Sequence, residues 1–175
     1  MPFKSEEFSF IILCTEPNAI LLQSTVKSLK LGYPNDFIAV IPNNFKADVV
    51  NEMKAICPVF RAKDTITSLL NTGMRNVPSN WGIFTMAGTW IRRNLPVKYS
   101  RFATNEADVL FPIVDRISNF KQATLNGLCI NKKTFKKAGP FQEQGQIEQC
   151  KERWALIATA SCKTKFKAIL GAAIL

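Results

Sequence analysis

Hydrophobic and polar positions in the first half of the chain alternate between short apolar runs and helix-like patterns. Each run is bounded by polar or turn-forming residues and is nearly uninterrupted, as in a strand covered on both faces. This order predicts an α/β fold with a mainly parallel sheet and helices on both faces. We expect Phe8–Cys14 to be central, with Trp81–Thr85 adjacent or near it. The runs are Phe8–Cys14, Phe37–Ile41, Pro58–Phe60 and Trp81–Met86.

Apolar residues at helical spacing predict a helix after each of the first three runs. We expect the first helix to end at Gly32, and Asp64 or Thr65 to cap the third. The helical positions are Ile20, Leu21, Val26 and Leu29, then Val49, Val50, Met53 and Ile56, then Ile66, Leu69, Leu70 and Met74.

The second half of the chain is less regular. Asp108–Val114 and Ala123–Ile130 are predicted as strands, and Ile147–Ala160 as a helix. A single helical turn is expected at Thr134–Ala138, closed by Gly139-Pro140, while Phe166–Leu170 fits a strand or a helix equally well. Without a repeat or linker, residues 1–175 are expected to form a single domain.

Ligands of doubly wound sheets bind beyond the carboxyl ends of the strands. Four predicted loops lie there and become the candidate binding region. They are Thr15–Asn18, Pro42–Phe45, Arg61–Asp64 and Ala87–Trp90.

The net charge of +10, from 23 basic and 13 acidic residues, favours anionic partners. Most lysines are scattered, and local clusters occur only at Lys132, Lys133, Lys136 and Lys137 and at Lys163, Lys165 and Lys167. A solvated basic surface is the simpler interpretation of each cluster, and a polyanion site is the alternative. Nucleic acid is not an expected partner, because no recognition helix, RNA-binding aromatic motif or continuous basic stripe occurs.

The five cysteines are widely spaced and the chain has no histidine, which argues against a zinc site of the usual kind and fits a reducing compartment. The N-terminus has acids where a signal peptide needs an apolar stretch. The longest terminal apolar run, Ala168–Leu175, is eight residues, too short to cross a bilayer. We therefore expect a cytoplasmic protein without a transmembrane segment.

Four segments, taken in order, resemble the family-2 glycosyltransferases. They are Ser9-Phe10-Ile11-Ile12-Leu13-Cys14 with Leu22, Ser28-Leu29 and Gly32-Tyr33-Pro34; Asn71-Thr72-Gly73-Met74; Trp81-Gly82-Ile83-Phe84-Thr85; and the acceptor-side stretch Asn126–Phe141. The resemblance covers nearly the whole chain. It implies the A-type nucleotide-diphospho-sugar transferase fold, a three-layer α/β/α sandwich.

In that family an Asp-x-Asp motif holds a divalent cation that bridges the diphosphate of the donor. The matching positions here are Met86-Ala87-Gly88, and neither Met86 nor Gly88 has the oxygen ligand that Mg²⁺ or Mn²⁺ prefers. We therefore expect no divalent metal site and no other cofactor. Arg92 and Arg93 are candidate substitutes that hold the diphosphate, although surface charge is an alternative explanation.

The resemblance implies the remaining site residues. Glu148 corresponds to the catalytic base that takes the proton of the acceptor hydroxyl, although an acid in the first turn of a helix also stabilises the helix dipole. Asn126 and Gly127 lie on the acceptor side. Together with Met86, Gly88, Arg92 and Arg93, the residues expected to bind the nucleotide-sugar are Thr15, Glu16, Asn43, Asp64, Asn71 and Trp90.

Two functions follow. The first is a glycosyltransferase-like protein that binds a nucleotide-diphospho-sugar and transfers the sugar without metal. The second is a non-catalytic descendant that binds a nucleotide, glycan or protein through the old cleft.

Overall fold

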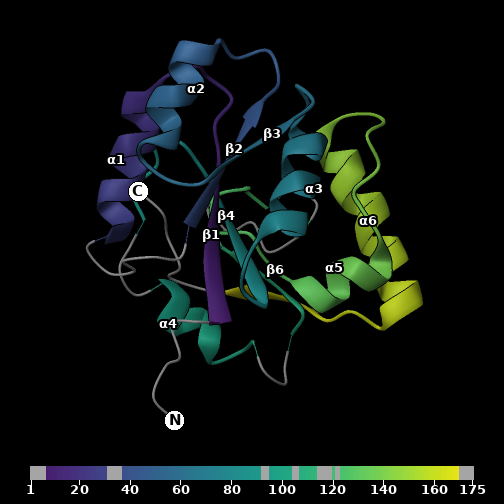
Figure 1. Cartoon of the computed structure of the whole chain (residues 1–175). Coiled ribbons are helices and arrows are strands. Elements are labelled where there is room, and N and C mark those ends of the chain that lie inside the picture. Colours follow the sequence, from purple (N-terminus) through teal and green to yellow (C-terminus); the bar gives the residue numbers. More distant parts are fainter. Residues whose placement is uncertain are drawn as a thin grey trace.

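The computed structural model describes residues 7–30, 37–91, 95–103, 107–113, 120 and 123–169. These residues form one seven-stranded sheet and six helices (Figure 1). The elements are β1 (Phe8–Leu13), α1 (Ala19–Lys30), β2 (Phe37–Pro42), α2 (Ala47–Lys54), β3 (Val59–Ala62), α3 (Ile66–Asn76), β4 (Trp81–Met86), α4 (Leu95–Ser100), β5 (Val109–Pro112), β6 (Cys129–Asn131), α5 (Lys132–Ala138), α6 (Ile147–Cys162) and β7 (Phe166–Ile169).

The strand order is β3-β2-β1-β4-β6-β5-β7. β1 pairs in parallel with β2 on one side and with β4 on the other, where Phe8 lies opposite Trp81 and Leu13 opposite Met86. Of the seven strands, only β6 runs against its neighbours β4 and β5. The predictions of a mainly parallel sheet and of a Trp81–Thr85 strand adjacent to the first strand are confirmed. The first strand, predicted to be central, is the third of the seven, and its neighbour β4 holds the central place.

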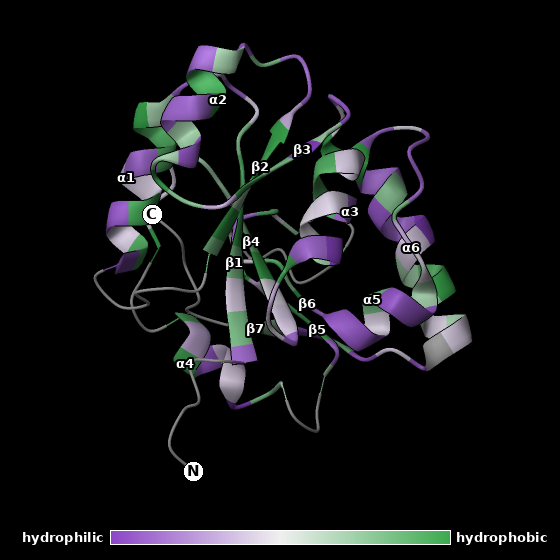
Figure 2. Ribbon diagram, viewed as in Figure 1, coloured by the Kyte–Doolittle hydropathy of each residue, from purple (hydrophilic) through white to green (hydrophobic). Residues whose placement is uncertain are grey.

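Helices cover both faces of the sheet, as the apolar strands required. Phe8, Phe10 and Ile12 of β1 join the core under α1, α2 and α4, whereas Ile11 and Leu13 join the core under α3, α5 and α6. Figure 1 shows α1 and α2 on one side of the sheet and α3, α5 and α6 on the other, and Figure 2 shows β2 between these layers in hydrophobic colours. The result is the predicted three-layer α/β/α sandwich.

Two glycines bring α3 unusually close to the sheet. A Cβ at Gly73 would clash with Cγ2 of Ile11, and a Cβ at Gly82 would lie 2.7 Å from Cδ1 of Ile11 and 2.9 Å from Sδ of Met74. Both positions therefore exclude a side chain in the packing as it stands.

The structure corrects several predicted boundaries in the second half. The expected strand Ala123–Ile130 is wrong over most of its length, because Gly127 has φ +82° and Leu128 N bonds Leu125 O in a turn, so that β6 begins at Cys129. The expected strand Asp108–Val114 is shorter, and is described as Val109–Pro112.

The helical segments of this half are longer than expected. The predicted turn at Thr134 begins at Lys132, since the Asn131 side chain accepts bonds from Lys133 N and Thr134 N and caps α5. α6 continues to Cys162.

Two elements had no clear local signal. Phe166–Ile169 is a strand because it pairs with β5, a choice that the residues alone left open. α4 was not predicted at all; Tyr99 anchors it by donating its hydroxyl to Gly127 O at 2.5 Å. In the part of the chain described here, no helix has both the length and the apolar character needed to cross a membrane.

Candidate functional site

A cavity of about 510 Å³ lies where β1, β2 and β3 end. It collects residues from the loops that follow all three strands, at the edge where the sequence placed the candidate binding region. Its lining is Thr15, Pro17, Asn44, Phe45, Lys46, Asp48, Val49 and Asp64.

A polar pair in the cavity lining joins two of these loops. Asn44 Nδ2 donates to Asp64 Oδ2 at 2.8 Å, and both side chains are exposed to solvent. Nearby, Asn43 N donates to Ala62 O at 2.7 Å and holds the end of β2 against β3. An amide beside a carboxylate offers both donors and acceptors to a ligand. Asp64 does not cap α3, since Thr65 accepts the bond from Ser68 N.

Of the three residues predicted in the loops after β1 and β2, only one lines the cavity. Thr15 lines the cavity. Glu16 is exposed in the β1–α1 loop and does not line the cavity. Asn43 is also exposed and does not line the cavity, whereas the next residue, Asn44, does.

The loop after β4 is tied to α1. Gly88 N donates to Leu21 O at 3.1 Å and to Thr25 Oγ1 at 2.9 Å, and the same hydroxyl donates to Thr89 O at 3.1 Å. Gly88 has φ +90°, a conformation that residues with a side chain rarely adopt. Met86 is half-buried and has no oxygen ligand, so these residues do not fit a divalent cation. No group of three or more Cys, Asp or Glu side chains that could hold a metal occurs among the described residues.

Asn126 and Gly127, predicted on the acceptor side, lie against the end of β4. Asn126 Oδ1 accepts a bond from Met86 N at 2.7 Å and lies 3.4 Å from the hydroxyls of Thr85 and Thr89. Gly127 N donates to Phe84 O at 2.7 Å. The pair fixes the backbone beside the positions that match the metal motif.

Asn71 is buried, with 4% of its surface exposed. Both its amide atoms bond the backbone of Phe141, so the structure gives this side chain a role in holding α3 to the segment after α5.

Glu148 is exposed in the first turn of α6 and lines a second cavity of about 380 Å³. This cavity includes Thr65, whereas the first includes Asp64, so the two cavities flank the same β3–α3 loop. One helical turn later, Lys151 is buried and donates its Nζ to Ala123 O at 2.6 Å. Burial lowers the pKa of Lys151, and the nearby Glu148 carboxylate acts in the opposite direction.

Three predicted site residues remain, all from the β4–α4 connection. Trp90 is 58% exposed in the β4–α4 loop but does not line either cavity. Arg92 and Arg93 lie outside the described residues.

Sequence reasoning missed several residues that line the first cavity. Asn44 lies in the loop after β2, Lys46 precedes α2 and Asp48 is in the first turn of α2. The candidate loop Pro42–Phe45 included Asn44 without naming it as a site residue, and the available signal for Lys46 and Asp48 was their position between that loop and the predicted helix. Thr25 was also missed, because nothing local marks a helix residue that bonds a loop 63 positions away.

The strand order and the two helical layers define the fold as an α/β/α sandwich with a mainly parallel sheet. No protein-family model matches the sequence, and no curated protein matches it either.

Solved structures with very different sequences share this fold. Staphylococcus aureus TarS 1-349 in complex with UDP-GlcNAc aligns with TM-score 0.64 and 12% identity, over 96% of this chain and 57% of that one. A cytidylyltransferase from Leptospira borgpetersenii aligns with TM-score 0.65 and 12% identity, over 94% and 76%. CMP:2-keto-3-deoxy-manno-octonic acid synthetase complexed with CTP aligns with TM-score 0.61 and 11% identity, over 96% and 91%. The chain spans 36% of the longer TarS structure.

Proposed function

We propose that this chain binds a nucleotide-diphospho-sugar, with the nucleoside in the cavity at the carboxyl ends of β1, β2 and β3. The cavity with its Asn44–Asp64 pair carries the proposal. Its volume of about 510 Å³ is in the range of small-molecule sites. TarS, bound to UDP-GlcNAc, and the synthetase, bound to CTP, give the proposal its ligand class.

The polar pair favours uracil over cytosine. Uracil offers a ring N–H between two carbonyl oxygens, which suits a carboxylate acceptor next to an amide donor. Cytosine placed in the same way presents an unprotonated ring nitrogen, whose lone pair would face the Asp64 carboxylate. It could pair with Asn44 and Asp64 only after a shift of the ring that brings its amino group to Asp64. We therefore expect UDP to bind better than CDP.

The loop after β1 favours a diphosphate over a triphosphate. Nucleotidyltransferases take a nucleoside triphosphate, whose larger negative charge needs cations or a row of backbone N–H groups. Here the loop is Thr15-Glu16-Pro17-Asn18, which has a carboxylate, no cation and a proline without an N–H. This composition supports a family-2 glycosyltransferase-like protein rather than a nucleotidyltransferase.

Sugar transfer, if this chain performs it, is proposed to be metal-independent. Glu148 would accept the proton of the attacking hydroxyl, and Arg92 and Arg93 would balance the charge of the departing diphosphate. The common β3–α3 loop between the two cavities supports the pairing of Glu148 with the nucleoside site.

A non-catalytic nucleotide-binding module is the second candidate. The observation that favours it is the hydrogen bonding of Gly88 to α1, because the backbone N–H at this position is already engaged. Such a protein would bind UDP without turning over a UDP-sugar.

Isothermal titration with UDP, CDP and uridine, with and without Mn²⁺, tests the proposal. We expect UDP to bind best, with the same affinity when Mn²⁺ is present. Asp64→Asn should weaken UDP binding about tenfold, since a hydrogen bond to a charged group contributes roughly 1.5–3 kcal/mol. Asp48→Asn, which removes the same charge from the same cavity, is the matched control and should change affinity much less. If none of these ligands binds, or if CDP binds better than UDP, the proposal is wrong.

A further inference from the structure

The parallel strands begin at the edge of the sheet opposite the nucleoside cavity, and we call this the amino edge. Hydrogen bonds there join the start of α5 to the residues before β4 and β5, and the residue before β7 to the residue before β5. Lys132 N donates to Asn80 O at 2.8 Å, Asn131 N donates to Asp108 O at 3.0 Å, and Lys165 N donates to Asp108 Oδ2 at 3.1 Å. The Lys132 ammonium also bonds Val77 O at the end of α3.

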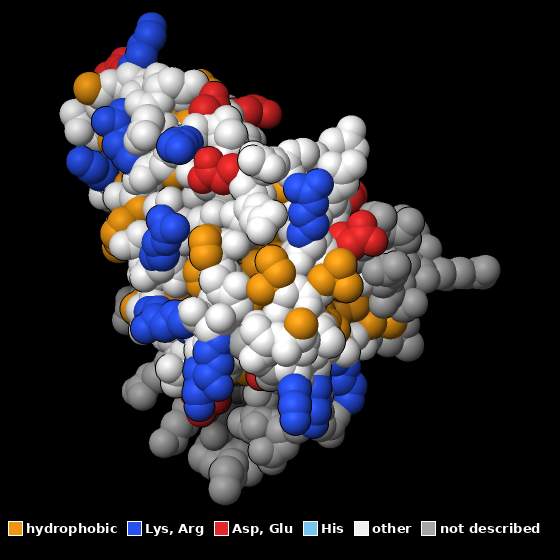
Figure 3. All heavy atoms as spheres, turned by 90° about the vertical axis from the view of Figure 1, so that its right-hand side faces the viewer, with side chains coloured by type: hydrophobic (Ala, Val, Ile, Leu, Met, Phe, Trp, Pro, Cys, Tyr) orange, Lys and Arg blue, Asp and Glu red, His pale blue; other side chains and the backbone are white. Residues whose placement is uncertain are grey.

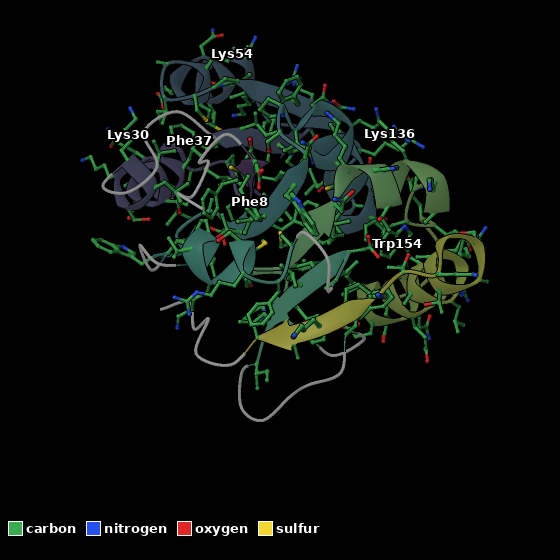
Figure 4. All side chains as sticks on the ribbon, turned by 90° about the horizontal axis from the view of Figure 1, so that it is seen from below. Phe8, Lys30, Phe37, Lys54, Lys136 and Trp154 are labelled. Carbon is green, nitrogen blue, oxygen red and sulfur yellow. The ribbon has the colours of Figure 1, made fainter. Side chains whose placement is uncertain are left out.

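Exposed cations gather at this end, and we call them the basic end. They come from the last turn of α3, from α5 and from the α6–β7 connection, and neither α3 nor α5 contains an acidic residue. Figure 3 shows Lys and Arg side chains over the lower part of the face that carries α5 and α6, and Figure 4, seen from below, shows Lys136 at the outer side of α5. The basic end comprises Arg75, Lys133, Lys136, Lys137, Lys163 and Lys165.

Local helix energetics explain only part of these cations. Arg75 in the last turn of α3, and Lys136 and Lys137 in the last turn of α5, are favourable to the helix dipole. Lys132 and Lys133 in the first turn of α5 are unfavourable. Lys133 repels Lys136 and Lys137 at the helical spacings of three and four residues. Lys163 has φ +51°, a left-handed conformation in which glycine would be relaxed. A favourable contact with an anionic partner would offset these costs.

The basic end also borders an apolar pocket. A cavity of about 250 Å³ is lined by Met74, Phe135, Gly139 and Pro140, with Arg75 and Lys136 beside them. Apolar walls next to two exposed cations match a ligand that has both an anionic group and a hydrocarbon segment.

We propose that the basic end binds the surface of a bilayer that contains anionic phospholipids. Lipid phosphates contact the cations, and the pocket beside Arg75 and Lys136 accepts a hydrocarbon segment of one lipid. The nucleoside cavity, at the opposite edge, carries the carboxylates of Asp48 and Asp64. The same lining includes Lys46, so carboxylates and cations lie together at that edge. An anionic surface therefore attracts the basic end more strongly than the cavity edge, and the cavity faces the solvent.

A bilayer fits these residues better than a nucleic acid does. Single-stranded nucleic acids are held by a basic groove with exposed aromatic rings for base stacking. The aromatic residue of this surface, Phe135, is 4% exposed and cannot stack on a base. Its cations lie on separate elements, as expected for contact with a broad anionic surface.

Sedimentation with vesicles tests the proposal. The vesicles are phosphatidylcholine alone, or phosphatidylcholine with about one third phosphatidylglycerol, in about 50 mM salt, where screening is moderate. We expect binding only to the anionic vesicles. Lys133→Glu/Lys137→Glu should weaken it at least roughly tenfold, since each basic residue near such a surface contributes about fivefold. The matched control Lys46→Glu/Lys63→Glu, with the same charge change at the cavity edge, should stay within about threefold of the wild type.

Both double variants are expected to fold, so that their vesicle binding can be compared. The Lys133→Glu substitution places an acid in the first turn of α5, where it favours the helix dipole, and Lys137→Glu places one in the last turn, where it opposes the dipole. The two effects offset each other, and circular dichroism should show the wild-type spectrum for both double variants. The proposal is overturned if the wild type ignores anionic vesicles or if both double variants lose binding equally. It is also overturned if inorganic phosphate or duplex DNA displaces the protein from the vesicles at matched phosphate concentration.

Discussion

The side chain of Asn71 makes two hydrogen bonds to the backbone of Phe141. Its Nδ2 donates to Phe141 O at 2.9 Å, and its Oδ1 accepts from Phe141 N at 2.8 Å. The pair lies in the buried layer between α3 and α6, where the Phe141 ring stacks on Trp154 with centroids 4.9 Å apart. A helix of the first half of the fold is thereby fastened to a segment 70 residues later.

Asn71→Ala should be strongly destabilising. The substitution leaves the N–H and C=O of Phe141 buried without partners, and each orphaned group costs roughly 1–3 kcal/mol. We expect the free energy of unfolding in urea to fall by about 2–4 kcal/mol. Asn76→Ala, which removes an exposed bond to Thr72 O from the same helix, is the control and should cost far less. Equal losses would contradict the role of Asn71.

Gly73→Ala should destabilise the protein although alanine is the better helix former. In an exposed helix this change would gain about 1 kcal/mol. Here the new methyl group would overlap Cγ2 of Ile11, and relieving the clash must move α3 or the sheet. We expect a net loss of roughly 1–3 kcal/mol in urea unfolding. A gain in stability would show that α3 is packed less tightly than described.

Gly88→Asp tests why the metal motif is absent from the loop after β4. The positive φ of this residue is strained for any side chain, so the substitution should cost about 1–3 kcal/mol of stability. Gly88→Ala should cost a similar amount, because the strain lies in the backbone. Thermal unfolding of both variants checks this, and an Asp variant as stable as the wild type would contradict it.

Lys151→Met should reduce the pH dependence of stability in the alkaline range. Burial lowers the pKa of Lys151 below its ordinary value of 10.5, so between the two pKa values the unfolded chain binds more protons than the folded one. Stability therefore rises with pH across this window through the contribution of Lys151. Urea unfolding at several pH values, compared between wild type and variant, isolates this contribution. Parallel pH profiles would contradict it.

Glu148→Gln separates catalysis from binding. If the protein transfers sugar, loss of a general base should lower the rate about 10²–10⁴-fold and leave UDP affinity unchanged. Glu143→Gln, which changes another carboxylate of the same cavity, is the control and should keep most of the activity. A Glu148→Gln variant with the wild-type rate would exclude this residue as the base.

The order of strands and helices through residue 90 was predictable from the sequence. A strand buried on both faces must be apolar at nearly every position, and Phe8–Leu13 shows that composition without reference to its neighbours. The same order of strands and helices predicted which edge of the sheet carries the cavity. Thr15 and Asp64 could be named for that reason, since loops after parallel strands meet at one edge.

Tertiary structure alone decided the features that join distant residues. β6 is only three residues long because the turn before it packs against the end of β4, and β7 is a strand because β5 lies beside it. The bond between Asn44 and Asp64 spans 20 positions, and that between Thr25 and Gly88 spans 63. Local sequence patterns indicate which side chains are buried. They do not indicate which distant residue a polar side chain will bond, because that depends on how the folded chain brings the two together.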